Sequence, residues 1–260
     1  MKSVQKRLDM VSEQAVYSKA KRYRHTLQRF PGIGLKPLIK RTGTQDGEVL
    51  LHDDDLWIND TFDYKQETIG KRFVVTSAQY GAAVNMKFLR ALENYCDDME
   101  AQLIVLPIRY GNQPDPLKPV LEPYACYNDF PLNDNIGLNM MPLRPTLVNP
   151  LSSLGRTGGI ASQIFASPKV QLEPVATLDG HHPKMLMTTG AVTYPEYQPD
   201  KTGAVALRDH NFAAVVIEVE SETIFHYRHL IADDKNSFYD VNGKKYTPRT
   251  VKKIKNPVGS

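Results

Sequence analysis

The feature that most constrains the fold is a pair of apolar strands separated by one amphipathic helix, within residues 71–112. The apolar run Phe73–Val75 ends in a polar turn, and helical spacing of apolar residues follows over 82–100. A second apolar run, Leu103–Leu106, comes directly after the helix. Strand, helix and strand joined by short connections are typical of a βαβ unit with two parallel neighbouring strands.

The rest of the chain predicts further strands but no internal repeat. Residues 113–160 are rich in Pro, Asn and Gly and predict extended chain dominated by loops. Strand candidates follow at 164–175, 185–193, 212–220 and 223–231, and the last two predict a hairpin across Ser221-Glu222. We therefore expect an α/β or α+β fold: a central mixed sheet with a βαβ unit, plus an N-terminal basic amphipathic helix.

The charge is unevenly distributed, although the 260 residues carry a formal net charge of only +3. Residues 1–41 have a surplus of nine positive charges and residues 241–260 a surplus of six, which leaves residues 42–240 at −12. Clustered cations favour phosphate backbones or acidic surfaces. Three readings stay open: nucleic-acid binding, neutralisation within the chain or its oligomer, and an acidic protein partner.

These charges suggest a basic helical arm (1–41), an α/β body (42–240) and a basic tail (241–260). In the arm, apolar residues recur at three- and four-residue steps up to Phe30, and Pro31-Gly32 ends the pattern. The predicted nucleic-acid-binding residues are Lys19, Lys21, Arg22, Arg24, Arg29, Lys36, Lys40, Arg41, Lys244, Lys245, Arg249, Lys252, Lys253 and Lys255. The interleaved aromatic residues Tyr17, Tyr23, Phe30 and Tyr246 suggest stacking on unpaired bases, although the spacing of Tyr23 also fits packing.

Polar residues at the ends of the two βαβ strands suggest a phosphate pocket, because ligands of open α/β sheets bind beyond the carboxyl ends of the strands. The predicted pocket residues are Ser77, Gln79, Arg109, Asn112 and Arg156. The last lies in a Gly-rich segment, 152–165, whose backbone N–H groups suggest a phosphate nest. That segment matches neither a P-loop nor a dinucleotide fingerprint. Ordinary turn polarity also explains these residues.

No catalytic residue, cofactor or metal site is predicted. His52 with Asp54, His181 with His182, and His226 with His229 form only pairs, whereas a metal needs several converging ligands. Cys96 and Cys126 form no CxxC motif, and they suit a reducing compartment. No apolar run is long enough to span a bilayer, so we expect no membrane contact and a cytoplasmic location.

The stretches RFVVTSAQYG, VNMKFLRALENYC and AQLIVLPIRYGN, followed by MLMTTGAVTYPEY and HNFAAVVIEVE, resemble the frame of calcineurin-like metallophosphoesterases. Where that family has Asp-x-His, this chain has Ser77-Ala78-Gln79, and Gln113 follows Gly111-Asn112. Without those ligands, the resemblance implies a scaffold that binds without catalysing. The TSAQ, NPLSSL and TTGAVTYPEY stretches also resemble an uncharacterised set of bacteriophage proteins.

Three functions follow from these observations. The first is a non-enzymatic phage protein that binds nucleic acid, with single-stranded DNA favoured because no recognition-helix motif is present. It would act in DNA metabolism or transcription in the host cytoplasm, alone, as a homo-oligomer, or with a phage or host polymerase. The alternatives are a metal-dependent phosphoesterase or nuclease, and an interaction protein that uses its basic ends for oligomer contacts.

Overall fold

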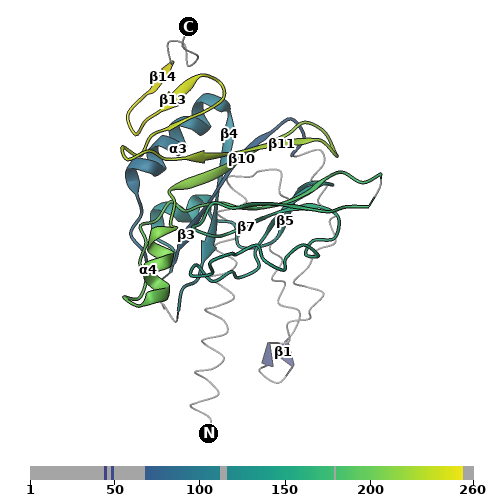
Figure 1. Ribbon diagram of the computed structural model, residues 1–260, viewed down its shortest axis with the longest axis horizontal. Coiled ribbons are helices and arrows are strands. Elements are labelled where there is room, and N and C mark those ends of the chain that lie inside the picture. The colour runs from purple at the N-terminus through teal and green to yellow at the C-terminus, as the bar shows by residue number, and fades with distance from the viewer. Residues whose placement is uncertain (1–43, 46–47, 50–67, 112–115, 179, 254–260) are drawn as a thin grey trace. The chain divides into compact units, whose positions relative to one another are not determined.

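The computed structural model describes residues 44–45, 48–49, 68–111, 116–178 and 180–253 (Figure 1). The chain divides into two units, Met1–Glu67 and Thr68–Ser260. In the first unit, β1 (Thr44–Gln45) pairs antiparallel with β2 (Glu48–Val49). The remaining elements belong to the second unit, so the N-terminal helix predicted for residues 1–30 lies outside the described residues.

A four-stranded mixed sheet forms the centre of the second unit. It comprises β3 (Arg72–Gln79), β4 (Ala101–Ile108), β10 (Ala213–Val219) and β11 (Phe225–Ile231), in the order β11-β10-β3-β4. The strands β3 and β4 are parallel, and β10 is antiparallel to both β3 and β11. The predicted βαβ unit, its parallel strands and the 212–231 hairpin are therefore confirmed.

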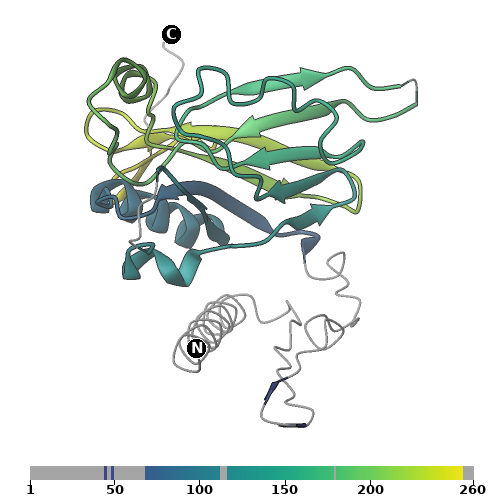
Figure 2. The same ribbon diagram turned by 90° about the horizontal axis from the view of Figure 1, so that it is seen from below.

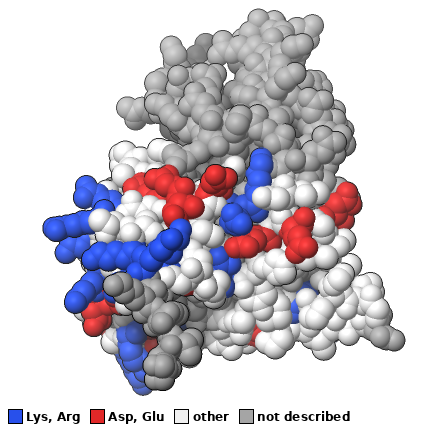
Figure 3. All heavy atoms as spheres, turned by 90° about the horizontal axis from the view of Figure 1, so that it is seen from above, with Lys and Arg blue, Asp and Glu red and all other residues white. Residues whose placement is uncertain are grey.

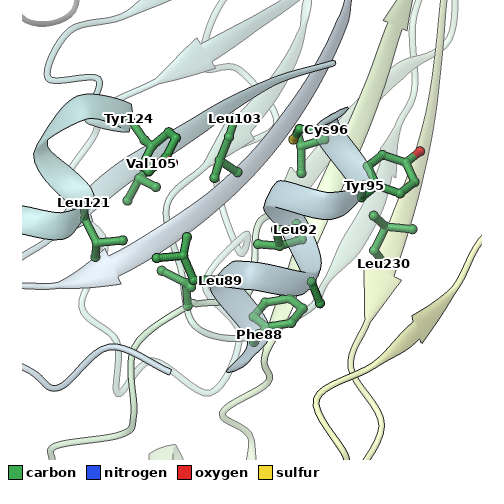
Figure 4. Close-up of a cluster of buried hydrophobic side chains, with 14 of the residues drawn as sticks. Phe88, Leu89, Leu92, Tyr95, Cys96, Leu103, Val105, Leu121, Tyr124 and Leu230 are labelled. Carbon is green, nitrogen blue, oxygen red and sulfur yellow. The ribbon is translucent and has the colours of Figure 1, made fainter. Parts of the chain in front are cut away.

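Helix α3 (Met86–Met99) connects β3 to β4 and covers one face of this sheet (Figure 4). It begins where the Asn85 side chain accepts a hydrogen bond from the backbone N–H of Phe88, and it ends at Glu100 in the left-handed conformation. The apolar positions of α3 recur at helical spacing, so Phe88, Leu92 and Tyr95 are fully buried against the sheet. The 3-10 helix η2 (Pro119–Tyr124) adds Leu121 and Tyr124 to the same core.

A second, five-stranded sheet lies on the side of the central sheet opposite to α3 (Figure 2). It comprises β5 (Phe130–Asn133), β6 (Ile136–Asn139), β7 (Ser162–Phe165), β9 (Lys184–Thr188) and β8 (Leu172–Val175), in that spatial order. His229 of β11 hydrogen-bonds to the carbonyl oxygen of Thr188, 2.9 Å away, which links the two sheets directly. Helix α4 (Lys201–Arg208) follows β9 in the chain and precedes β10.

The last described part of the chain forms a three-stranded antiparallel sheet. Its strands are β12 (Phe238–Tyr239), β13 (Lys244–Tyr246) and β14 (Val251–Lys253), in chain order. Residues 241–253, predicted to be part of a tail, therefore contain two strands of this sheet, of which β13 pairs with β12 and contributes Tyr246 to the main core. The charge pattern alone could not predict that Tyr246 is part of the core, because other elements supply the apolar residues that it contacts.

Two more expectations differ from the structure. The candidate strand 164–175 is two strands, β7 and β8, because the chain leaves the sheet between them. The loop-rich stretch 113–160 contains η2 and the β5–β6 hairpin, whose four-residue strands are too short to give a clear pattern. Neither α3 nor α4, the two α-helices among the described residues, has the length and apolar character of a membrane-spanning helix.

Candidate nucleic-acid interface

The three-stranded sheet is attached to the core through one face. Phe238 and Tyr246 face each other across β12 and β13, are almost completely buried, and stack with ring centroids 5.5 Å apart. Tyr246 also packs edge-on against Tyr95 of α3. Because side chains alternate along a strand, this register fixes which residues of the sheet point inward.

Polar contacts with α3 complete the attachment. The Lys244 ammonium lies 2.7 Å from an Asp98 carboxylate oxygen, and the Tyr246 hydroxyl donates to the same carboxylate at 2.7 Å. The hydrogen bonds from Lys244 and then Tyr246 hold the pKa of Asp98 below its usual range. One turn earlier on α3, the Asn94 amide donates to the carbonyl oxygen of Thr247 at 2.9 Å. The predicted phosphate contact Lys244 is therefore already paired within the chain.

The opposite face of this sheet carries a row of three side chains that run across the strands. Tyr239 is paired with Lys245, and Lys245 is paired with Lys252. Tyr239 is 56% exposed and Lys252 is exposed, whereas Lys245 is half-buried. We call Tyr239, Lys245 and Lys252 the outer row. The prediction that Tyr246 stacks on bases is wrong, because its ring is buried; Tyr239 is the exposed aromatic residue of this sheet.

Lys245 is held in place by two partners. Its ammonium lies 2.9 Å from a carboxylate oxygen of Asp233 and 3.0 Å from the hydroxyl oxygen of Tyr239. The hydrogen bond to Asp233, followed by that to Tyr239, raises the pKa of Lys245. Lys245 therefore remains charged, and Asp233 already offsets much of that charge.

The remaining predicted cations of this segment are exposed. Arg249 lies in the turn between β13 and β14, and Lys252 and Lys253 belong to the edge strand β14. Within the part of the chain that the structure describes, none of the three forms an ion pair. We call Arg249, Lys252 and Lys253 the basic edge. Figure 3 shows the molecule from above Figure 1, on the side where β13, β14 and α3 lie. Lys and Arg side chains gather on this side, next to a band of Asp and Glu side chains.

A buried ionic network supports the start of this sheet. The Asp240 carboxylate, whose side chain is fully buried, accepts hydrogen bonds from both Nε and Nη2 of Arg228 on β11. The Tyr95 hydroxyl donates to Asp240 at 3.1 Å, and Arg228 also pairs with Glu218 at 2.8 Å. Burial and the nearby Asp240 charge raise the pKa of Tyr95. The network connects β10, β11, α3 and the residue that follows β12.

The predicted phosphate pocket is used differently inside the fold. The Ser77 hydroxyl donates to the carbonyl oxygen of Gly190, and the Gln79 amide donates to that of Glu196 at 2.8 Å. The backbone N–H of Gln79 donates to the Thr193 hydroxyl at 3.0 Å. Both side chains are buried, so the segment after β9 closes the carboxyl end of β3. These contacts argue against the predicted role of Ser77 and Gln79 in binding a ligand.

Arg109 and Arg156 are both exposed but belong to different parts of the fold. Arg109 follows β4, and its guanidinium lies 5.5 Å from the centre of the Tyr80 ring. Arg156 precedes β7, in the Gly-rich segment. There the buried Lys184 ammonium donates to the carbonyl oxygens of Gly155, Thr157 and Gly159, so the loop surrounds a cation of the chain itself. No local pattern indicates this role of Lys184, because it lies 25 residues beyond Gly159 in the chain.

Several predicted residues lie outside the described part of the chain. These are Lys19, Lys21, Arg22, Arg24, Arg29, Lys36, Lys40, Arg41, Asn112 and Lys255, together with Tyr17, Tyr23, Phe30, His52 and Asp54.

The other histidine pairs do not converge on a common point. His226 pairs with Glu220 at 2.7 Å, whereas His229 bonds to Thr188, and His181 and His182 are exposed. Among the described residues, no three His, Cys, Asp or Glu side chains are grouped as a metal site requires. Cys96 and Cys126 are not joined in a disulfide bond, and burial raises the pKa of Cys126 to about 11.

Comparison with known proteins finds similarity to a bacteriophage protein. The chain is 29% identical over 188 residues to Protein A1 of Escherichia phage T5, a match that covers 66% of this chain and 34% of that protein. The chain thus spans about a third of the length of this curated relative. No protein-family model matches the chain, and no solved structure matches it. The similarity agrees with the resemblance to phage proteins, whereas no match supports the resemblance to metallophosphoesterases.

Proposed function

We propose that this chain is a nucleic-acid-binding protein that prefers single-stranded DNA and contacts the phosphate backbone through the basic edge. The observation that carries the proposal is a division among the five cations of residues 241–253. Lys244 and Lys245 are paired with carboxylates of the body, whereas Arg249, Lys252 and Lys253 are exposed and have no such partner in the described chain. Unpaired cations clustered on one edge supply the electrostatic term that dominates nucleic-acid affinity.

Two further cations extend this surface. Lys87 and Arg90 are exposed on α3, and Asn94 lies on the same face of the helix because the three residues are spaced by three and four positions. Asn94 donates to Thr247, two residues before Arg249 in the chain. This contact brings the cations of α3 into the same region of the fold as the basic edge, and the acidic residues Asp97 and Asp98 follow Asn94 on the helix.

The position of these charges favours binding over neutralisation within the chain. A basic segment that served only to neutralise the acidic body would pair its cations with that body, as Lys244 and Lys245 do. The basic edge remains available to a ligand outside the described chain. Similarity to a phage protein suggests a phage origin, and binding of single-stranded DNA would suit a role in phage DNA metabolism or transcription.

A salt-titrated binding assay tests the proposal. The full chain is titrated against labelled single-stranded and double-stranded DNA at several salt concentrations, together with the Lys252→Ala/Lys253→Ala double variant. Loss of two phosphate contacts should reduce the slope of log affinity against log salt by about 1.4 for single-stranded DNA. The affinity itself should fall by about tenfold, since each exposed contact contributes up to ~1 kcal/mol.

The matched control is Arg144→Ala/Lys201→Ala, which removes the same charge from two exposed positions outside this surface. An equal loss in both double variants would show a general charge effect and contradict the proposal, as would an affinity that salt leaves unchanged. The same samples are incubated with Mn²⁺ or Mg²⁺, with and without a chelator. Cleavage that the chelator abolishes would show instead a metal-dependent nuclease.

A further inference from the structure

We propose that the outer row is a stacking site for one unpaired base, in which the Tyr239 ring contacts the base and Lys252 contacts a flanking phosphate. This inference rests on the proposed nucleic-acid binding and specifies where and how a single strand is recognised. It starts from the register of the three-stranded sheet, which turns Phe238 and Tyr246 inward and therefore Tyr239, Lys245 and Lys252 outward.

The Tyr239 ring is held in position but left open. More than half of the side chain is exposed, and no aromatic neighbour stacks on it among the described residues. The Lys245 ammonium lies 3.0 Å from the Tyr239 hydroxyl oxygen but 4.6 Å from the ring centre. The cation therefore lies over the ring near its hydroxyl end and holds the ring in place, and a base would contact the exposed part of the ring.

The neighbouring cation is suitably placed for the backbone of the same strand. Adjacent β-strands lie roughly 4.8 Å apart, so Lys252 on β14 is about 10 Å from Tyr239 on β12, across β13. Lys245 stands between them and is already paired with Asp233, whereas Lys252 has no ion-pair partner in the described chain. A base stacked on Tyr239 thus leaves its phosphates within reach of Lys252 and of the nearby Arg249.

This arrangement favours single strands over duplexes. In a duplex, each face of a base is covered by its neighbours in the stack, so a side chain on the surface of a sheet cannot reach it. An unpaired base offers its π-face to an aromatic ring, and this contact is tolerant of sequence because every base has such a face. We therefore expect the site to bind unpaired bases with little sequence preference.

The test compares an oligodeoxythymidylate with an abasic oligonucleotide of the same length and charge. The full chain, Tyr239→Ala and Tyr239→Phe are titrated against both, and thermal unfolding shows that the variants remain folded. We expect Tyr239→Ala to weaken binding of oligodeoxythymidylate by between about fivefold and a hundredfold. Tyr239→Phe, which keeps the ring, should stay within about threefold of the original chain.

The abasic strand isolates the base contact. The unchanged chain should bind the abasic strand more weakly than oligodeoxythymidylate, by about the factor in affinity that Tyr239→Ala loses on oligodeoxythymidylate. Tyr239→Ala should bind the abasic strand as tightly as the unchanged chain does, because removing the base and removing the ring abolish the same interaction. Tyr194→Ala, which removes an exposed tyrosine outside this sheet, serves as the control and should bind as the unchanged chain does. Equal affinity for the normal and abasic strands would overturn the stacking site and leave the proposed function standing. Failure to bind either strand would overturn both.

Discussion

The carboxyl end of β3 and the three-stranded sheet show two opposite uses of polar and charged residues. At the end of β3, the side chains of Ser77 and Gln79 turn inward and are bonded to the backbone of a covering segment. On the three-stranded sheet, Tyr239 and Lys252 turn outward while Tyr246 is buried. A polar pattern typical of a binding site therefore has that role only where no other segment of the chain covers it.

The largest expected effect concerns the network that anchors the three-stranded sheet. Asp240→Ala would leave the Arg228 guanidinium without the carboxylate that it contacts through two nitrogen atoms. Removing one partner of a buried ion pair costs about 3–5 kcal/mol, and because Arg228 keeps its ion pair with Glu218, the free energy of unfolding should fall by an amount towards the lower end of that range. Urea denaturation measures it. Asp234→Ala, at an exposed neighbouring position, should change stability by less than about 0.5 kcal/mol. A comparable loss in both variants would show that the network does not anchor the sheet.

The next effect concerns the segment that closes the end of β3. His210 bonds through Nε2 to the carbonyl oxygen of Thr193 and through Nδ1 to the Tyr197 hydroxyl, each at 2.8 Å. Because a carbonyl can only accept, Nε2 carries the proton and Nδ1 accepts one from the hydroxyl. Burial lowers the pKa of His210 from 6.5 to about 4. The folded chain therefore keeps this histidine neutral where the unfolded chain protonates it.

Stability should consequently fall as the pH drops from about 6.5 to about 4, because the unfolded state binds the extra proton in that window. Across this pH range, protonation at His210 should lower the free energy of unfolding by about 3 kcal/mol, and above the range it should cause no loss. Denaturation at several pH values measures it, and His210→Gln should flatten the dependence. Part of the dependence of stability on pH should remain in this variant, because burial also lowers the pKa of His229. His181→Gln, at an exposed position, should leave the curve unchanged; a flat curve for the unaltered chain would contradict the prediction.

The smallest effect concerns Ser77, at the covered end of β3. Ser77→Ala removes a buried hydroxyl whose acceptor, the carbonyl oxygen of Gly190, keeps hydrogen bonds from the backbone N–H of Ser77 and the Thr189 hydroxyl. We expect a loss of about 1 kcal/mol in stability and no change in affinity for DNA. Thermal unfolding and the salt-titrated assay measure the two quantities. If affinity fell while stability did not, Ser77 would belong to a ligand site after all.

Much of the central fold was predictable, because its signals are local. Apolar runs at Phe73–Val75 and Leu103–Leu106, with a helical stripe between them, determine a parallel βαβ unit through short connections. The hairpin β10–β11 has the same local origin. The β5–β6 hairpin and β14 were not predictable, because their strands have only three or four residues, too few to give a clear alternating pattern.

The candidate site was predictable in charge but not in detail. Residues 241–253 hold five cations and no acid, and this was evident from the sequence. That Lys244 pairs with Asp98 and Lys245 with Asp233 follows from contacts across 146 and 12 positions, which no local pattern signals. Strand alternation could have suggested that Tyr246 and Lys245 point in opposite directions, had these residues been recognised as a strand.

The βαβ unit and the concentration of positive charge at residues 241–253 can be read from neighbouring residues, because hydrophobic periodicity and composition are local properties. Which of those charges is exposed depends on how the chain folds. Packing of Phe238 and Tyr246 against α3 fixes the inward face of the three-stranded sheet and leaves Tyr239, Lys252 and Arg249 outside. The segment after β9 likewise covers Ser77 and Gln79. Availability depends on what distant segments bury, and only the folded chain brings those segments together.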